Sequence, residues 1–420
     1  MYYLINIAML TIIINSSGSL IASSLNEENV LKILKLVKKQ SNAVLAVKQS
    51  QIASNYSYEG TGYFPDPKVK LKFFGSPIET RNGPQRSNVM VSQVIPWPSV
   101  LRADEELASN KAKIKAEQVE ILLLDLSFEV KSIIYKYVEI SKKIVNKRKM
   151  IINFNNLNQV VLGRLKLGAA HQAEVSRINI EIAKLTQSVR TLEAKKIAIQ
   201  EKLRSMTGGE GVGDLLPISL HPKWTQIGSF DPSKIEIEGH PYIRLAKAKL
   251  GAAQASIEKQ NSKRLPKLGA SVSWFQIDRR NSAMSGSEAG KDAWAIGASI
   301  SIPVWGSKYD SLEKSSVSKQ KSAQMGLNQM NLDLRTKIKS VYEEFRSTSE
   351  VSLIFANDII PQAEQALKSD RESYAQGSVP FERIITDYIR VISFEDQLVE
   401  NQAKQAALKA SLERFIGKSL

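Results

Sequence analysis

The sequence predicts an internally duplicated α+β membrane protein, in which long antiparallel helical hairpins are combined with four strands of a shared transmembrane β-barrel. Three observations predict this fold class. The second half of the chain repeats the first, each half holds two runs of alternating apolar and polar residues, and each half holds two long segments with heptad spacing.

The duplication is seen most directly near the end of each half. Residues 165–208 align without a gap on residues 374–417, a shift of about 209 positions. Under that shift Val175 falls on Ile384 and Ile182 falls on Val391, so apolar residues meet apolar residues at helical spacing. Each half is therefore expected to run helix, strand, loop, strand, long helix, tight turn, long helix.

These patterns give expected boundaries for every part of the chain. An apolar run of about ten residues near the start, followed by small and polar residues, indicates a signal peptide. The strand pairs are expected at 65–96 and 266–303, with loops at 76–86 and 276–292 between the strands of each pair, and the helical hairpins at 98–207 and 307–416. The parts in chain order are the signal peptide (1–24), an N-terminal equatorial segment (25–40), repeat 1 (41–208), an inter-repeat equatorial linker (209–239) and repeat 2 (240–417).

Composition narrows the function classes. The 420 residues include no cysteine, so disulfides and thiolate metal sites are excluded. The net charge is +16, but Lys and Arg are scattered among Asp and Glu, which favours a solvated helix surface over a nucleic-acid partner. Three histidines without ligand spacing predict no metal site and no cofactor. A glycine-rich stretch at 209–213 lacks the Lys-Ser/Thr of a phosphate loop, and we expect no enzymatic activity.

The strands carry the membrane prediction. After the first residues, no stretch reaches the roughly 18 apolar residues of a transmembrane helix, so membrane insertion must use strands. In the last strand one apolar face alternates with Ala, Gly and Ser, and this face is expected to meet lipid: Trp294, Ile296, Ile300 and Ile302. Four strands are too few to close a barrel, and an open edge in lipid is costly, so several copies must share one.

The helices are predicted from their spacing. Leu123, Leu126, Val130 and Ile133 begin a run of alternating three- and four-residue steps, which is heptad packing. A helix from 99 to about 162 would be on the order of 100 Å long. Gly168 and Gly377 lie at the turns between long helices, where a positive φ is commonly needed.

Several short motifs support a family resemblance. His240-Pro241 opens the second half, Leu265-Pro-Lys-Leu268 enters a strand, Ile300-Ser-Ile-Pro303 leaves one, and Tyr374-Ala-Gln-Gly377 forms the hairpin turn. Together with the duplicated pattern, the sequence resembles the TolC-type outer-membrane efflux family, the outer membrane factors, over essentially the whole mature chain. The stretches 65–67 and 93–96 are similar to members that serve heavy-metal pumps of the resistance-nodulation-division (RND) class.

The resemblance implies an assembly and its partners. It implies a homotrimer in the outer membrane, with a barrel of about twelve strands and with helices forming a periplasmic α-barrel. The far end would meet a periplasmic adaptor (membrane fusion protein) and an inner-membrane pump of RND or ABC type. The chain would then be the passive channel component of a tripartite efflux or export system.

The resemblance also assigns residues near the hairpin turns. Tyr374 matches a tip tyrosine that helps to hold the aperture closed, and the segment 382–387 matches a stretch that can carry an acidic ring. The gate candidates are Tyr374, Glu382, Arg383 and Asp387. The candidates for adaptor docking at the tip are Arg164, Lys166, Gly168, Arg371 and Gly377.

Simpler interpretations stay open for these residues and for the chain. Each charged gate candidate could be an ordinary solvated helix residue, and Tyr374 could merely pack against a neighbouring helix. The chain could also be a periplasmic coiled-coil scaffold without a pore, which would tolerate Ile300→Lys, or a basic rod that binds nucleic acid. Such a rod would bind DNA in a salt-dependent manner.

Overall fold

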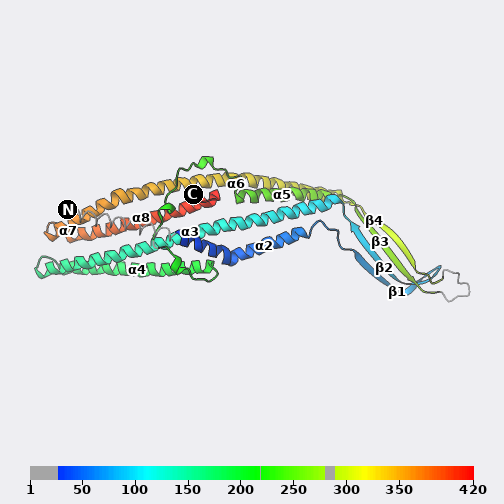
Figure 1. The fold of residues 1–420 in the computed structure, drawn as a ribbon, viewed down its shortest axis with the longest axis horizontal. Helices are drawn as coiled ribbons and strands as arrows, with labels where there is room; N and C mark the ends of the chain where they lie inside the picture. The colour runs from blue at the N-terminus through cyan, green and yellow to red at the C-terminus, as the bar shows by residue number, and fades with distance from the viewer. Residues whose placement is uncertain (1–26, 218, 280–288) are drawn as a thin grey trace, which may run out of the picture. The chain divides into compact units, whose positions relative to one another are not determined.

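The computed structural model describes residues 27–217, 219–279 and 289–420 (Figure 1). These residues form two compact units, each built from separate stretches of the chain. The sheet unit comprises residues 49–118 and 242–330, and the helical unit comprises residues up to 48, 119–241 and 331–420. The predicted signal peptide, residues 1–24, lies outside the described residues.

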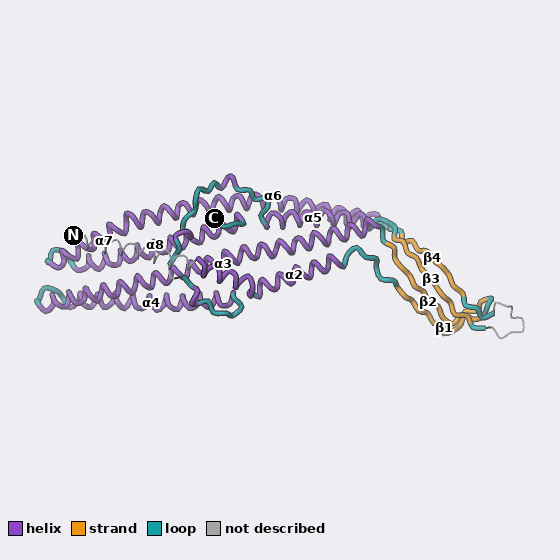
Figure 2. Tube along the Cα trace, viewed as in Figure 1, coloured by secondary structure: helices purple, strands orange, loops and turns teal. Residues whose placement is uncertain are grey.

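The sheet unit contains four antiparallel strands in the order β1-β2-β3-β4 (Figure 2). Their bounds are β1 Lys68–Thr80, β2 Gly83–Ile95, β3 Lys267–Ile277 and β4 Ala293–Ser301. The two strand pairs come from opposite halves of the chain and join through β2 and β3. Within the described chain β1 pairs only with β2 and β4 only with β3, so the sheet has two open edges.

The register places side chains of one kind in rows across the sheet. Val69, Val91, Val272 and Ile296 are consecutive partners and form one apolar row. A parallel row joins Leu71, Val89, Trp274 and Trp294. Directly paired residues point to the same side of a sheet, so these two rows make one apolar face.

The opposite face carries short and polar side chains. One row of partners consists of Lys68, Ser92, Ser271 and Gly297. The predicted alternation between an apolar face and a small, polar face is therefore present in the sheet, and it is supplied by the period of two along each strand.

The first hairpin differs from the prediction. A loop was expected over 76–86, but β1 continues to Thr80 and Gly83 already pairs with it, which leaves a two-residue turn. Gly83 has φ of 134°, a conformation that favours glycine. The register shifts between Phe73 and Ile78, so a bulge absorbs the irregular residues that the sequence suggested were a loop.

Four helical stretches complete the sheet unit. They belong to α2 (Asn42–Glu59), α3 (Pro98–Lys166), α5 (Pro241–Ser262) and α6 (Gly306–Ile354). Ion pairs join α5 to α3, with Arg244 Nη2 lying 2.8 Å from Glu117 Oε2 and Lys259 Nζ lying 2.7 Å from Asp104 Oδ1. Near the sheet, the indole nitrogen of Trp97 donates to the carbonyl of Pro266 across 2.6 Å.

The helical unit consists mainly of two helical hairpins. The first pairs α3 with α4 (Gln172–Met206), and the second pairs α6 and α7 (Ile360–Ala375) with α8 (Phe381–Ile416). One apolar cluster contains residues of α3, α4, α7 and α8, including the fully buried Ile178 and Ile384. The heptad positions predicted from the sequence supply these buried side chains.

The outgoing helix of the second hairpin is interrupted. The sequence predicted one helix over 307–374, but residues Phe355–Ile359 form a π-helical turn between α6 and α7. Pro361 follows at the start of α7. Proline has no N–H and its ring crowds the carbonyl four residues earlier, so the wider turn accommodates it without ending the helix.

The equatorial segments pack on the hairpins within the same unit. Residues 27–40 are helical and contribute Ile33 and Val37 to a buried cluster. The linker adds Trp224, whose ring lies 5.3 Å from that of Tyr135 in α3. The ammonium group of Lys409 donates to two linker carbonyls, which ties α8 to the linker. No described helix combines the length and apolarity that crossing a bilayer demands.

Candidate functional site

The candidate site lies at the tips of the two hairpins of the helical unit. The tip turns contain Gly168 and Gly377, with φ of 71° and 80°, in the left-handed region that was predicted for them. The N–H groups that follow each helix donate back to its last carbonyls, as in the bond from Gly377 to Tyr374. Each helix therefore ends abruptly, and the side chains of the last turn are brought close to the neighbouring hairpin.

Tyr374 joins the second hairpin to the first. Its side chain is only 4% exposed, and its hydroxyl donates to Glu174 Oε2 of α4 across 2.6 Å. Its ring lies 6.0 Å from that of Phe381 at the start of α8. Burial first, and the adjacent Glu174 carboxylate second, raise the pKa of the Tyr374 hydroxyl, so it remains a donor at physiological pH.

Arg164 adds a second connection at the same tyrosine. Its guanidinium lies 4.3 Å from the centre of the Tyr374 ring, which is a cation–π contact. It also donates to the Tyr374 carbonyl and, across 3.1 Å, to the carbonyl of Ala169. The sequence suggested Arg164 as a docking residue, whereas in the structure its guanidinium is engaged with Tyr374.

Glu382 and Arg383 each form an ion pair, with different partners. Glu382 accepts from Arg177 of α4, so this pair also joins the two hairpins. A hydrogen bond from its own backbone N–H, and next the Arg177 guanidinium, lower the pKa of Glu382. Arg383 Nε donates to Asp370 Oδ2 of α7 across 2.6 Å, which ties α7 to α8 within the second hairpin.

Asp387 is the most buried of the charged candidates. It is 7% exposed and forms a carboxyl pair with Asp370, while Arg390 lies 3.2 Å from it. Burial first, and then Asp370, raise the pKa of Asp387. Its hydrogen bond to Asp370 is the main cause that lowers the pKa of Asp370, with Arg383 acting in the same direction. When the pair carries one proton, that proton is therefore preferentially on Asp387.

The two repeats explain where this pair lies. At the shift of 209, Asp370 falls on Val161 and Asp387 falls on Ile178. Val161 and Ile178 are both fully buried in the apolar cluster of the tip. The second hairpin thus places two carboxyl groups at positions that its counterpart fills with hydrocarbon.

The structure brings together some of the predicted residues and separates others. Tyr374 and Arg164 are in contact, and Glu382 joins the same surface through Arg177, whereas Arg383 and Asp387 form a second group around Asp370. Sequence reasoning missed Glu174, Arg177, Asp370 and Arg390 as partners. The exchange of Val161 and Ile178 for aspartates between the repeats is the signal that could have found Asp370.

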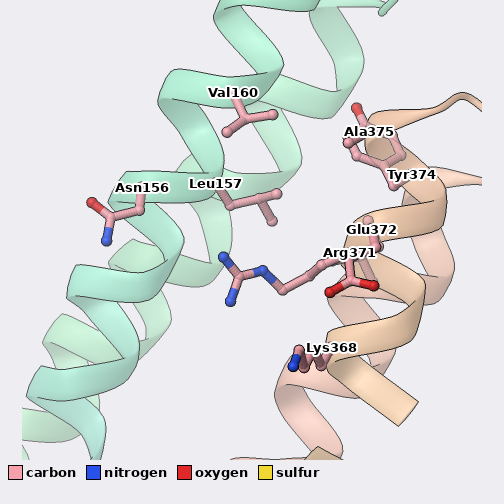
Figure 3. A pocket seen from close by; sticks show the side chains of 9 residues that line it. Asn156, Leu157, Val160, Lys368, Arg371, Glu372, Tyr374 and Ala375 are labelled. Atoms are coloured by element: carbon pink, nitrogen blue, oxygen red, sulfur yellow. The ribbon is translucent and has the colours of Figure 1, made fainter. Parts of the chain in front are cut away.

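The remaining tip candidates line the exposed end of the hairpins. Lys166 and Gly168 are exposed at the first turn. Arg371 extends from α7 into a groove of about 520 Å³ between α7 and α3, beside Leu157 and Asn156 (Figure 3). Lys368 and Glu372 line the same groove, so it presents both charge signs around an apolar floor.

The residues predicted to face lipid lie on the apolar face of the sheet or just beyond it. Trp294 and Ile296 are 71% and 73% exposed, and Ile300 and Ile302 are also exposed. A contiguous set of large exposed apolar side chains on one sheet face marks a surface for contact with a protein partner or a membrane. In the ranges that the structure describes, no group of three or more His, Asp or Glu side chains could hold a metal ion.

Comparisons with known proteins agree with this architecture. Residues 234–418 match the model of the outer membrane efflux protein family. No curated protein sequence matches the chain. Among solved structures, CusC is 12% identical with a TM-score of 0.78, and the alignment covers 93% of this chain and 92% of that one.

Two further structures show the same fold. VceC of Vibrio cholerae, an outer membrane protein, is 14% identical with a TM-score of 0.76 over 93% of this chain and 96% of its own. The MtrE outer membrane channel of Neisseria gonorrhoeae is 13% identical with a TM-score of 0.76 over 93% and 89%. The second repeat therefore matches the outer membrane efflux protein family, and the chain has the fold of these solved outer-membrane proteins.

Proposed function

We propose that this protein is the outer-membrane channel of a tripartite efflux system, a passive conduit that is gated at the tips of its helical hairpins. The observation that carries the proposal is the sheet: it has one apolar face, one small and polar face, and two open edges. Those three properties together fit a part of a cylinder that has lipid outside and water inside.

The open edges require other copies of the chain. In hydrocarbon each unpaired backbone N–H or C=O costs several kcal/mol, so β1 and β4 need partners. The β4 edge of one copy can pair with the β1 edge of the next, and three copies give about twelve strands. The long hairpins of the same copies would then surround the continuation of the pore through the periplasm.

The tip contacts would hold the closed state. Tyr374–Glu174 and Arg177–Glu382 join the second hairpin to the first. Arg164 adds a third link through the ring and carbonyl of Tyr374. Opening the tip by moving one hairpin away from the other requires all three to break, so these contacts are the gate in this proposal.

A periplasmic adaptor and an inner-membrane pump, of RND or ABC type, would supply the opening force and the energy. The exposed turn residues Lys166, Gly168 and Gly377, and the groove beside Arg371, are the proposed docking surface for the adaptor. Arg164 would contribute indirectly, because an adaptor that displaces its guanidinium also loosens Tyr374.

Planar-bilayer recording of the purified full chain tests the proposal. We expect trimers that insert and give discrete single-channel currents, small in the closed state and larger when Arg177→Glu and Tyr374→Phe weaken the tip. A correctly folded, helical preparation that stays monomeric and never conducts would contradict the conduit and would favour a scaffold without a pore.

A further inference from the structure

Four lysines lie on the small, polar face of the sheet. Lys68, Lys70 and Lys72 alternate along β1, and their partners in β2 are Ser92, Met90 and Asn88. The same rows continue through Ser271 and Ser273 of β3, so the lysines are on the face opposite the apolar rows. Lys267 of β3, paired with Ser301, is the fourth.

On the lysine side of the β1 bulge, this face has no negative charge to balance them, and Glu79 lies beyond the bulge. The paired stretches 68–73, 87–95, 267–275 and 293–301 contain no Asp or Glu. No ion pair involves these four lysines in the described chain, and Lys68, Lys70 and Lys72 are exposed. The mixture of Lys and Arg with Asp and Glu that the helices carry is therefore absent from these four stretches, and the other charged strand residues, Glu79 and Arg86, lie outside them.

Protection of a sheet edge does not account for the pattern. Lysines on an edge strand do discourage unwanted pairing. However, β4 is also an edge strand and carries no charged residue, whereas Lys267 lies in an internal strand. The lysines follow a face of the sheet and not its edges.

The lysine face is also the more crowded face. A Cβ atom built on Gly269 would lie 2.6 Å from Ser299 Oγ, and one built on Gly297 would lie 2.8 Å from Ser271 Oγ. Ser273 on this face is buried, although its neighbours Val272 and Trp274 on the apolar face are exposed. On β3 and β4, the side chains are therefore more closely packed on the lysine face than on the apolar face.

We propose that these lysines make the outer-membrane part of the pore an anion-selective passage, so that the conduit favours negatively charged solutes. This inference rests on the proposed function, because it takes the polar face to line the lumen. Three copies would place twelve ammonium groups on that wall, and the remaining positions are mostly Ser, Ala and Gly, together with Asn88, Met90, Val94 and Phe275. A ring of charged side chains in a narrow pore sets which ions pass.

The expected range of the effect follows from screening. At about 0.1 M salt the Debye length is about 10 Å, and at about 1 M it is about 3 Å. A barrel of about twelve strands has a lumen wider than that of an eight-stranded barrel and narrower than that of a porin. At the lower salt concentration, the electrostatic field of the lysines would extend across much of this lumen. Selectivity should therefore be strong in dilute salt and weak in concentrated salt.

The test is the reversal potential of single channels in asymmetric KCl. We expect the unmodified channel to prefer chloride severalfold, and the variant Lys68→Gln/Lys70→Gln/Lys72→Gln to lose most of that preference while it still conducts. Arginine at the same three positions should retain it. The control variant Lys35→Gln/Lys38→Gln/Lys39→Gln removes the same charge outside the sheet and should leave the chloride preference unchanged.

The outcomes separate this inference from the proposed function. If the unmodified chain forms pores without chloride preference, or if the triple glutamine variant keeps it, the lysine inference is wrong and the conduit stands. If the chain forms no pores at all, both are wrong. Should the triple variant fail to assemble, the single variant Lys70→Gln must still shift the reversal potential toward the cation side.

The absence of cysteine allows an independent check. In Lys70→Cys the new thiol is the only one in the chain, and a charged, water-soluble thiol reagent should modify it and change the conductance. Val69→Cys, one residue away on the opposite face, should be inert to the same reagent. Equal reaction at both positions would contradict the inference, because it would show that the apolar face is as accessible to water as the lysine face.

Discussion

The Tyr374 hydroxyl donates a 2.6 Å hydrogen bond to Glu174, which lies 200 residues earlier in the chain. This bond connects the last turn of α7 to the first turn of α4, and it is partly shielded from water because Tyr374 is buried. The two hairpins are thus linked beside their turns by a hydrogen bond as well as by the apolar cluster that they share.

The first prediction concerns this bond. Tyr374→Phe keeps the ring, its packing and its contact with Arg164, but removes the donor. A net loss of about 1 kcal/mol would shift the balance between closed and open tips roughly fivefold. We expect a higher open probability in planar bilayers, whereas Tyr388→Phe, a change in the same apolar cluster, should leave gating near that of the unmodified protein.

The second prediction concerns the ion pair between α4 and α8. Both Arg177 and Glu382 are more than half exposed, so the pair alone contributes little to stability. Arg177→Glu should open the tip by placing two carboxylates together, and adding Glu382→Arg should close it again. Conductance measured at low and high salt checks this, because screening should reduce the difference between variants. Persistent opening of the double variant would contradict the pairing.

The third prediction concerns pH. The pKa of Asp387 is raised and that of Asp370 is lowered, so the Asp370–Asp387 contact between α7 and α8 is favoured while Asp387 is protonated and Asp370 is ionised. The contact should weaken as pH rises through the raised pKa of Asp387, and also as pH falls through the lowered pKa of Asp370. Asp387→Asn should abolish the alkaline limb of a conductance–pH profile, because the amide cannot ionise.

The neighbouring charges define the control for that experiment. Arg383 and Arg390 form ion pairs with the two carboxyl groups, Arg383 with Asp370 and Arg390 with Asp387. Arg390→Gln removes a charge that favours ionised Asp387, so it should move the alkaline limb to higher pH without removing it. A profile that is unchanged in Asp387→Asn would place the titrating group elsewhere.

The fourth prediction uses the relation between repeats. The double variant Asp370→Val/Asp387→Ile gives the second hairpin the residues that the first has at Val161 and Ile178. Replacing a buried polar pair by hydrocarbon of similar size is often neutral or stabilising, whereas removing one partner is costly. We expect the double variant to unfold at a higher temperature than either single variant, and its tip to open less readily.

The fifth prediction concerns the sheet. Ile296→Lys puts a charge on the apolar face, where the cost near the middle of a bilayer is about 2–4 kcal/mol. The matched variant Ala295→Lys puts it on the opposite face, next to Ser273. We expect heat-stable oligomers in membrane extracts to be lost only for Ile296→Lys. Equal tolerance of both changes would argue against a lipid-facing surface.

Much of this fold could be predicted because its signals are periodic. Heptad steps give the long helices and alternation gives the strands, since each pattern reports which side chains are buried together. Interruptions that are decided by single residues were missed. Pro361 turned a predicted continuous helix into α6, a π-helical turn and α7, and the bulge between Phe73 and Ile78 extended β1 through a predicted loop.

The tip residues were predictable only in part. Family resemblance pointed to Tyr374 and Asp387, but their partners Glu174 and Asp370 are set by contacts between helices that spacing along one helix does not report. The replacement of Val161 by Asp370 under the repeat shift is a local anomaly in a buried stripe, and it marks the pair. An internal duplication can therefore serve as its own reference for finding polar residues in a core.

The unpaired β1 and β4 edges have a genetic consequence. In the proposed cylinder every copy pairs with its neighbours through two edge strands, β1 and β4. A copy with one defective edge could still be incorporated into a trimer and would prevent that trimer from closing. An allele that damages β4 alone should then be dominant over the intact gene in the same cell, in contrast to an allele that prevents synthesis of the chain.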